Sequence, residues 1–281
     1  MFKTGLAARI VAVAFAVAIS WGEATSFASA SISQLTHDKR WDAARSDLAR
    51  GKAAQAKAAF EELLKQYPND ADLHLFLGMS LLRLRDPLAA VIEIKKAIGI
   101  DPAHVEARTL LGYVELEVRG DAAAALREYT KVVELKPDRA EAYSNLAVAQ
   151  KRQGNLDDAI VSLNKALELK PDFGAAMTNR GAIFAEQVKW AEAKRDFEQA
   201  LKINPKDDGA LYGLSQVLRE ERNYAGAQRA LSELISRSPN FVYWLEWGRI
   251  GLIRYWWALL LIAVGWGLKG RIMKVRTEAN G

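Results

Sequence analysis

The sequence predicts an all-α fold, a solenoid of about six helix-turn-helix repeats. Three observations carry the prediction. Prolines recur at a nearly constant spacing, other residue types recur in register with them, and each interval between prolines reads as two amphipathic helices. Six of the seven prolines in the chain follow this spacing. They are Pro68, Pro102, Pro137, Pro171, Pro205 and Pro239.

Three residue columns keep the same register as the prolines. Alanine stands twelve residues before each proline: Ala56, Ala90, Ala125, Ala159, Ala193 and Ala227. A larger residue stands eight before it: Phe60, Ile94, Tyr129, Leu163, Phe197 and Leu231. Small residues recur in the first half of each unit: Ala44, Gly78, Gly112, Ala147, Gly181 and Ser215. This pattern indicates that small residues let two helices approach closely, while the larger column packs between neighbouring helices.

Each unit shows where its helices begin and end. The segment from Asn155 to Pro171 places its apolar residues on one helical stripe, and the proline ends the helix because it lacks a backbone donor. Asp138 is then expected to cap the next helix, with Glu141 three residues further on. Turn glycines inside three of the units are Gly51, Gly120 and Gly154.

The period, the alanine column and the terminal proline resemble the tetratricopeptide repeat family, whose signature includes small residues, an A-x3-F spacing and a terminal proline. The resemblance covers roughly Thr36 to Asn240 and implies a right-handed superhelical solenoid. The predicted units are approximately 37–70, 71–104, 105–139, 140–173, 174–207 and 208–240, within a solenoid domain of residues 31–240. The chain departs from the family at the first tryptophan column, which holds Arg40, His74, Arg108, Tyr143, Met177 and Leu211.

Two units deviate from the others. The first has Asp47 where an aromatic residue is usual in the family, so its leading helix is expected to serve as a cap. The third carries one extra residue near Gly120, which predicts a longer inner turn.

A solenoid of this kind presents a concave groove, lined by the first helix of each unit, that holds peptides or helices. The resemblance places the candidate groove residues at Thr109, Tyr113, Ser144, Asn145, Lys151, Thr178, Asn179, Tyr212, Gln216 and Arg219. Asn145 and Asn179 stand one repeat apart, which predicts two rungs of amides that pair with the backbone of an extended peptide. The alternative is that asparagine is simply common at this place. The columns also predict a groove that is apolar towards its N-terminal half and polar, partly basic, towards the other. Such a groove matches a partner with a hydrophobic anchor and a polar or acidic segment.

Several classes of function are not supported by the sequence. The chain has no cysteine, which excludes disulfides and thiolate chemistry. His37, His74 and His104 fall in different repeat columns without metal-ligand spacing. There is no G-x-S-x-G motif and no phosphate-binding glycine loop. The net charge of +5 comes from the two ends of the chain rather than from a basic face. We therefore expect no enzymatic activity, cofactor, metal, small-molecule substrate or nucleic-acid partner.

The N-terminal residues 1–30 have the layout of a secretory signal peptide. Lys3 and Arg9 precede the apolar run 10–19, and the small residues around Ala30 predict cleavage there. The alternative is an uncleaved anchor, but the run supplies only about half of the ~20 apolar residues that a bilayer needs.

The C-terminal sequence predicts a transmembrane helix at residues 250–268, preceded by an interfacial segment (241–249) and followed by a basic tail (269–281). Only Arg254 is charged within the span. The predicted interface residues are Trp244, Trp247, Arg254, Trp256, Trp257, Trp266 and Lys269. The alternative is a buried C-terminal helix of a soluble domain. Together the two ends predict a single-pass protein of a bacterial inner membrane, with the solenoid in the periplasm and the C-terminus in the cytoplasm.

The sequence thus predicts a non-catalytic, membrane-anchored scaffold that recruits a protein or peptide partner to the assembly of an envelope or membrane complex. Two alternatives are a periplasmic holdase for unfolded or secreted substrates, and a regulatory subunit of an envelope synthase.

Overall fold

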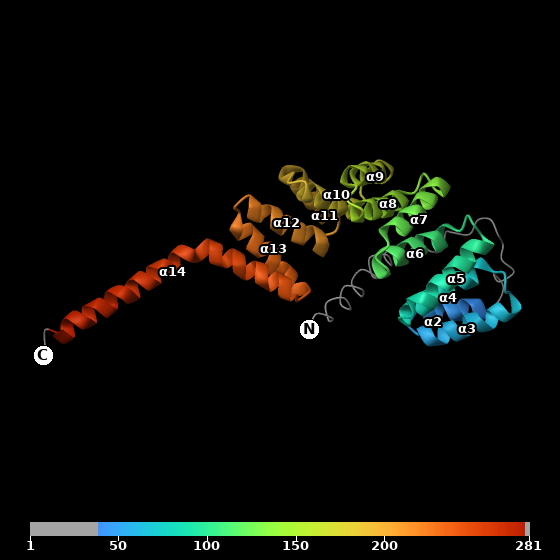
Figure 1. Ribbon diagram of the computed structural model, residues 1–281, viewed down its shortest axis with the longest axis horizontal. Coiled ribbons are helices and arrows are strands. Elements are labelled where there is room, and N and C mark those ends of the chain that lie inside the picture. The colour runs from blue at the N-terminus through green and yellow to red at the C-terminus, as the bar shows by residue number, and fades with distance from the viewer. Residues whose placement is uncertain (1–38, 279–281) are drawn as a thin grey trace. The chain divides into compact units, whose positions relative to one another are not determined.

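The structure, a computed structural model, describes residues 39–278, and every regular element within them is a helix (Figure 1). The predicted all-α class is therefore confirmed. The predicted signal peptide, His37 and the last three residues of the predicted tail lie outside the described residues.

The chain forms successive helix pairs separated by the turns that hold the prolines. The helices are α2 (Lys39–Ala49), α3 (Ala53–Gln66), α4 (Ala71–Arg83), α5 (Pro87–Ile100), α6 (Val105–Tyr113), the π-helical segment η3 (Val114–Val118), α7 (Ala122–Leu135), α8 (Ala140–Arg152), α9 (Leu156–Leu169), α10 (Gly174–Glu186), α11 (Trp190–Ile203), α12 (Asp208–Glu220), α13 (Tyr224–Arg237) and α14 (Phe241–Glu278). Five pairs of helices that follow each other in the chain pack together: α2 with α3, α4 with α5, α6 with α7, α10 with α11, and α12 with α13.

The chain divides into two compact units, which meet in sequence between Asn155 and Leu156. The first unit contains α2 to α8, and the second contains α9 to α14.

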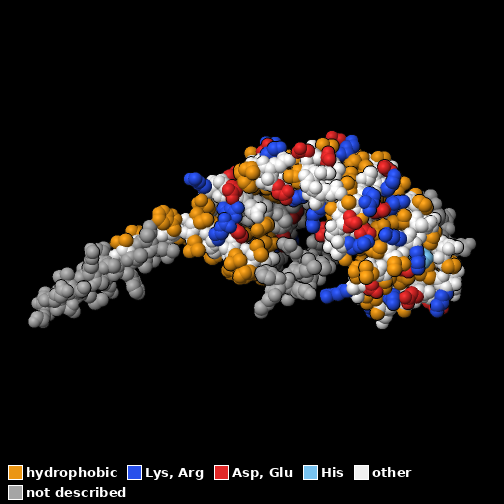
Figure 2. Space-filling view, in the orientation of Figure 1, with side chains coloured by type: hydrophobic (Ala, Val, Ile, Leu, Met, Phe, Trp, Pro, Cys, Tyr) orange, Lys and Arg blue, Asp and Glu red, His pale blue; other side chains and the backbone are white. Residues whose placement is uncertain are grey.

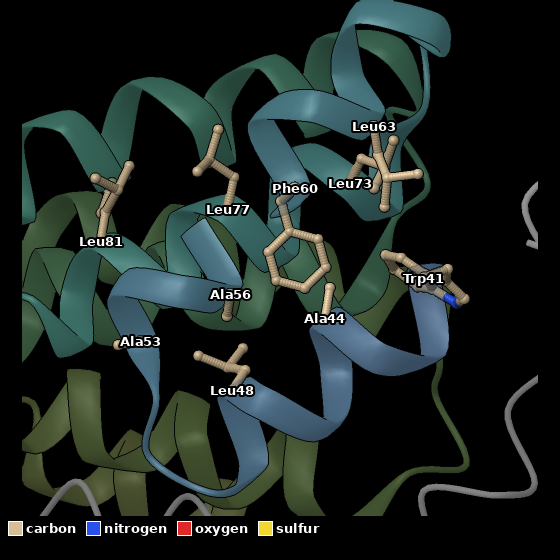
Figure 3. Close-up of a cluster of buried hydrophobic side chains, with 11 residues drawn as sticks. Trp41, Ala44, Leu48, Ala53, Ala56, Phe60, Leu63, Leu73, Leu77 and Leu81 are labelled. Carbon is tan, nitrogen blue, oxygen red and sulfur yellow. The ribbon is translucent and has the colours of Figure 1, made fainter. Parts of the chain in front are cut away.

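The three repeat columns form the core of both units. All six residues of the alanine column are fully buried, and the larger column is at most 4% exposed. Figure 3 shows the first of these clusters, where the Phe60 ring lies beside Ala44 and Ala56. At Gly112, in the small column, there is no room for a side chain. A Cβ at this position would lie 2.7 Å from Cε1 of Tyr129. The two helices of a pair can approach closely because the large side chains of one column fill the space that the small residues leave.

Replacing Gly112 by alanine is therefore expected to lower the free energy of unfolding by about 1–3 kcal/mol, because the added methyl group collides with the buried Tyr129 ring. Gly99 in α5 provides a matched control, since no atom lies within 4 Å of its Cβ position. There the same replacement should stabilise the protein by about 0.5–1 kcal/mol, because alanine favours helix over glycine. Urea denaturation followed by circular dichroism measures both changes, and equal signs would contradict this account of the small column.

The extra residue of the third unit lies inside a helix rather than in a longer turn. Helix α6 continues directly into η3, and a π-helical turn takes up one more residue than an α-helical turn. This keeps both Val114 and Leu116 buried, at 0% and 4% exposure. Glu115 between them is also buried, and its Oε1 accepts a hydrogen bond from Nη1 of Arg119 at 2.9 Å. The prediction of a lengthened inner turn was wrong because packing on both sides of the insertion fixes the helix.

The predicted cap of α8 is also corrected. Helix α8 begins at Ala140, and its cap residue is Arg139, which makes no side-chain capping bond, so Asp138 does not serve as the cap. Other helices are capped as the repeat pattern suggests. The Asp70 carboxylate accepts from the Leu73 backbone amide at 3.0 Å, and that of Asp207 accepts from Ala210 at 2.9 Å.

The predicted localisation is contradicted, and the predicted transmembrane helix at residues 250–268 is not confirmed. Nowhere in residues 39–278 is there a helix with the length and apolar character needed to cross a membrane. The predicted localisation, a single-pass inner-membrane protein with a periplasmic solenoid and a cytoplasmic C-terminus, is wrong on this finding. The predicted interfacial segment and span both lie within one continuous helix, α14.

Packing explains why the first part of α14 is a helix of the repeat domain. Ile250, the first residue of the predicted span, is 1% exposed and lies in a core cluster with Leu231 and Leu234 of α13. Two predicted interface residues also bind α13: Nε1 of Trp247 donates to the Ser232 hydroxyl at 2.9 Å, and Nη1 of Arg254 donates to Oε1 of Gln228 at 3.2 Å.

Among the described side chains, those of Trp244, Trp256 and Trp257 make no hydrogen bond to α13. Trp244, Trp256 and Trp257 are more than half exposed, and Figure 2 shows apolar side chains along the described part of α14. The side chains of Trp266 and Lys269 lie outside the described residues.

Arg249 shows why the repeats end at α14. It stands one period after Ser215, in the column that is otherwise small. Its side chain is 60% exposed and pairs with Glu246 at 3.3 Å. Because this column is where the second helix of a unit packs closely, a long charged side chain is incompatible with a further pair.

Candidate functional site

The candidate positions lie on the first helix of each pair. In the first unit we define the first-unit face by Arg45 of α2, Phe76 and Met79 of α4, Leu110 and Tyr113 of α6, and Asn145 of α8. The face is continuous at its start, because the Arg45 guanidinium lies 5.4 Å from the Phe76 ring. Met79, Leu110 and Tyr113 then pack against one shared core cluster.

Aromatic rings hold the α2 end of this face. The Trp41 and Phe76 rings meet edge to face at 4.9 Å, and the Phe60 ring lies 5.7 Å from Trp41. The guanidinium of Arg45 lies 5.6 Å from the Trp41 ring, within the range of a cation–π contact. The sequence reasoning missed Arg45 because the first helix was interpreted as a cap. The signal was present, since Arg45 stands one repeat before Met79 and two before Tyr113.

The middle of the first-unit face is apolar. Phe76, Met79 and Leu110 are half-buried, so each keeps part of its side chain accessible. Methionine is unbranched and adapts to irregular surfaces, which suits a site that holds a bulky apolar group. The apolar N-terminal half of the groove was predicted from these same positions, and it stays a prediction.

The α8 end of the face is polar. Asn145 is half-buried, and its amide makes no hydrogen bond with any described residue. Tyr113 is half-buried, and burial, with a smaller effect of Glu117, raises the pKa of its hydroxyl. Lys151 is also half-buried. An amide that makes no hydrogen bond with the described residues, and that lies beside an apolar surface, is suited to pair with the peptide backbone of a partner.

Two predicted residues of the first unit do not present their hydroxyl groups on the face. The hydroxyl of Thr109 donates to the Val105 carbonyl at 2.8 Å, within its own helix. Ser144 is buried, at 5% exposure. Neither hydroxyl is presented freely on the face.

The second unit presents its candidates on α10 and α12. Asn179 and Gln216 are half-buried, and neither side chain makes a hydrogen bond with a described residue. The Thr178 hydroxyl donates to Oδ2 of Asp207 at 2.8 Å. Arg219 pairs with Glu246 at 3.0 Å and with Glu220 at 2.8 Å. The ring of Tyr212 packs against that of Tyr243 at 5.3 Å.

The predicted asparagine ladder remains a prediction. Asn145 belongs to the first unit and Asn179 to the second, so each is placed within its own unit only. In both residues the amide makes no hydrogen bond with a described residue. The ladder needs such an amide at each of its two positions, because the amide must bond to the partner backbone.

The two described histidines join neighbouring helices. Nδ1 of His74 lies 2.7 Å from Oε2 of Glu93, and Nε2 of His104 lies 3.2 Å from Oδ1 of Asp72. Among the residues that the structure describes, no group of side chains has the arrangement of a metal site. These histidines therefore contribute to packing between repeats.

His104 makes stability depend on pH. Burial lowers the pKa of His104, but hydrogen bonds to Asp72 and Glu106 outweigh it and raise the pKa to about 9. A raised pKa means that the folded state binds this proton more tightly, so the stabilisation is complete below about pH 6.5 and is lost as pH rises through about 9. Urea unfolding between pH 6 and 9.5 should show this loss, and His104→Asn should flatten the curve in that window. An unchanged slope in His104→Asn would assign the pH dependence to other groups.

Comparison with known proteins identifies the class. Four models of the tetratricopeptide repeat match residues 42–105, 119–154, 140–173 and 184–245. The chain belongs to the tetratricopeptide repeat family, whose members are generally protein-interaction scaffolds that bind protein or peptide partners in a groove.

Particular solved structures share the fold. Pseudomonas aeruginosa pilF is 17% identical, with a TM-score of 0.65, covering 75% of this chain and 95% of that one. PilW, described as a widely conserved type IV pilus biogenesis factor, is 17% identical with a TM-score of 0.65 and coverage of 73% and 94%. YrrB, described as having an unusual peptide-binding site, is 19% identical with a TM-score of 0.51 and coverage of 68% and 98%. These likenesses show the fold. No curated protein sequence matched the chain significantly.

Proposed function

We propose that this protein is a non-catalytic scaffold that holds a segment of a partner protein on the first helices of its repeats and brings that partner into a larger assembly. The observation that carries the proposal is the first-unit face. It offers the half-buried apolar side chains of Phe76, Met79 and Leu110. Asn145 follows, with an amide that makes no hydrogen bond with the described residues. Apolar anchoring with a few placed polar groups is the usual chemistry of peptide recognition.

On the face drawn in Figure 2, the charge distribution supports a protein partner over a nucleic acid. Lysine and arginine side chains lie among aspartate and glutamate on the face drawn in Figure 2. A nucleic-acid site would require a face of one positive sign to neutralise phosphates.

The role in assembly is proposed from the relatives together with this face. PilW is described as a widely conserved type IV pilus biogenesis factor. A scaffold that holds one component by an exposed segment would act in the same general manner here.

Co-purification of the tagged full chain from its native cells, after gentle cross-linking, tests the proposal. The scaffold predicts one partner, or one defined set, in constant ratio to the chain. Many unrelated unfolded proteins would instead support the holdase, and one enzyme of cell-envelope synthesis would support the regulatory subunit. Loss of the partner in a Phe76→Ala variant that remains fully helical would locate the contact on the first-unit face.

A further inference from the structure

Helix α14 has one apolar side that the described chain leaves uncovered. Ile250 packs against α13, and the residues roughly opposite it on the helix point away from the core. Five of them follow one another at intervals of four, three, four and four residues. We call them the α14 stripe: Phe241, Leu245, Gly248, Leu252 and Trp256. The four large side chains are between 56% and 74% exposed, and none of the five residues is charged.

The spacing and the area of the stripe are those of a contact between two helices. Apolar residues at intervals of three and four form the seam along which helices pack together. The exposed parts of the four large side chains, with Val242 and Tyr255 on the flanks, amount to roughly 700 Å². This is close to the ~800 Å² that each partner contributes to a standard interface, and larger than the apolar patches of most monomers.

The order of side chains along the stripe is the same in both directions: aromatic, leucine, glycine, leucine, aromatic. The two leucines lie at equal distances from a point between positions 248 and 249, and so do the two aromatic residues. In an antiparallel pair of α14 helices around this point, Leu245 of one copy lies opposite Leu252 of the other, and Phe241 lies opposite Trp256. A two-fold interface requires a surface that is complementary to itself, and this order provides one.

Gly248 lies next to the point where the two helices would cross. No atom lies within 4 Å of its Cβ position, so packing inside the chain does not require a glycine there. A glycine within a helix lowers stability, but it allows another backbone to approach closely. Glu246 and Arg249 flank the stripe, and they pair with each other at 3.3 Å. Their charges therefore lie at the rim, where interfaces are usually polar.

We propose that two copies of this chain associate through the α14 stripe as an antiparallel, two-fold pair. The self-complementary order favours a second copy over an unrelated protein, because only a second copy carries the same side chains at the same distances from the axis. The pair uses α14 rather than the first-unit face, so the inference does not depend on the proposed function. A pair would carry two first-unit faces in one particle, which strengthens binding to any partner that presents its segment more than once.

Sedimentation equilibrium of the full chain tests the inference, and we expect a monomer–dimer equilibrium. Leu252→Gln should raise the dissociation constant about a hundredfold, because two-fold symmetry places the polar group in the interface twice. Leu261→Gln is the matched control and should leave the constant unchanged. Leu261 is 63% exposed on the same helix, against 62% for Leu252, but it lies on the side of Ile250.

The folded single chain should be unaffected by these replacements. Both variants should keep the helicity of the wild type by circular dichroism. In dilute, monomeric protein, replacement of a large side chain of the stripe should barely change unfolding by urea, because these side chains are exposed in the single chain.

Gly248→Leu distinguishes close packing from general apolar adhesion. A leucine at the crossing point should weaken the pair at least tenfold, because it holds the two helices apart. If the stripe acted only as an adhesive apolar surface, the larger apolar side chain would strengthen the association, and the proposed packing would be overturned.

Cysteine cross-linking tests the antiparallel order, since the chain has no cysteine of its own. Phe241→Cys and Trp256→Cys chains should form a disulfide-linked dimer when they are mixed and oxidised. Neither variant should link to itself, because the two copies of one cysteine would lie about 22 Å apart along the helices. Linking of each variant to itself, without a mixed product, would indicate a parallel pair and contradict the proposed order.

Three other results would overturn the pair itself. They are a monomer at every concentration, equal effects of Leu252→Gln and Leu261→Gln, and a monomeric chain that binds phosphatidylcholine vesicles through the stripe. The last result would assign the stripe to a lipid surface. None of the three would affect the proposed function, which is tested by loss of the partner in Phe76→Ala.

Discussion

Replacing Phe197 by alanine is expected to lower the free energy of unfolding of the second unit by about 3–5 kcal/mol. Phe197 is 1% exposed, and its ring fills the space left by two glycines of neighbouring helices. A Cβ at Gly181 would lie 2.9 Å from the ring, and one at Gly213 would lie 2.3 Å from it. Because both neighbours lack side chains, nothing can fill the cavity that the substitution leaves. Urea denaturation of the full chain, followed by circular dichroism, measures the change.

Phe241 supplies the control for this experiment, since it is 74% exposed at the start of α14. Phe241→Ala should change stability by less than about 0.5 kcal/mol. If both variants lost the same free energy, the large column would not be the centre of the repeat core.

The double replacement Asn145→Ala and Asn179→Ala is expected to weaken partner binding by roughly ten- to a hundredfold, because each amide would lose a hydrogen bond to the partner backbone. Helicity should not change, since neither side chain makes a hydrogen bond with the described residues of the free protein. Titration of the co-purified partner by fluorescence anisotropy, with circular dichroism of the same samples, measures both quantities.

Gln55→Ala is the matched control for the asparagines, since Gln55 is an exposed amide on α3, a second helix. It should bind the partner as the wild type does. Binding by the double variant at wild-type affinity would remove the asparagine ladder from the account, while the apolar part of the face would still stand.

The sequence was sufficient for the repeat architecture because every column that recurs is also a packing contact. The alanine column is buried in every unit, and residues such as Ile94 and Leu163 occupy the same kind of place as Phe60. Single-residue details were less predictable. Asp138 does not cap α8, and the extra residue of the third unit lies within the helix that contains η3. Both details depend on how the neighbouring helices pack.

The predicted localisation was wrong, and the predicted C-terminal span is not confirmed, for a physical reason. An apolar run flanked by tryptophans and basic residues has the same composition whether it packs on a neighbouring helix or crosses a bilayer. Only the packing of Ile250 and the hydrogen bond of Trp247 to α13 show that the start of α14 belongs to the repeat domain.

The candidate site was only partly predictable. Repeat columns placed Tyr113, Asn145, Asn179 and Gln216 on the first helices, where the structure has them half-buried. The columns carry no information on pairing partners, so they did not show that Thr178 and Arg219 are used between helices. Arg45 was missed because a single family position, Asp47, was given more weight than the period itself.

Site-specific photo-cross-linking tests the central claim, binding on the first helices, most directly. A photoactivatable residue at Met79 of the full chain lies on the first-unit face, and one at Leu88, which is 73% exposed on α5, lies on a second helix. Irradiation in the native cells should join one discrete protein to the Met79 position and none to Leu88. Cross-linking of the partner at Leu88 but not at Met79 would contradict the account.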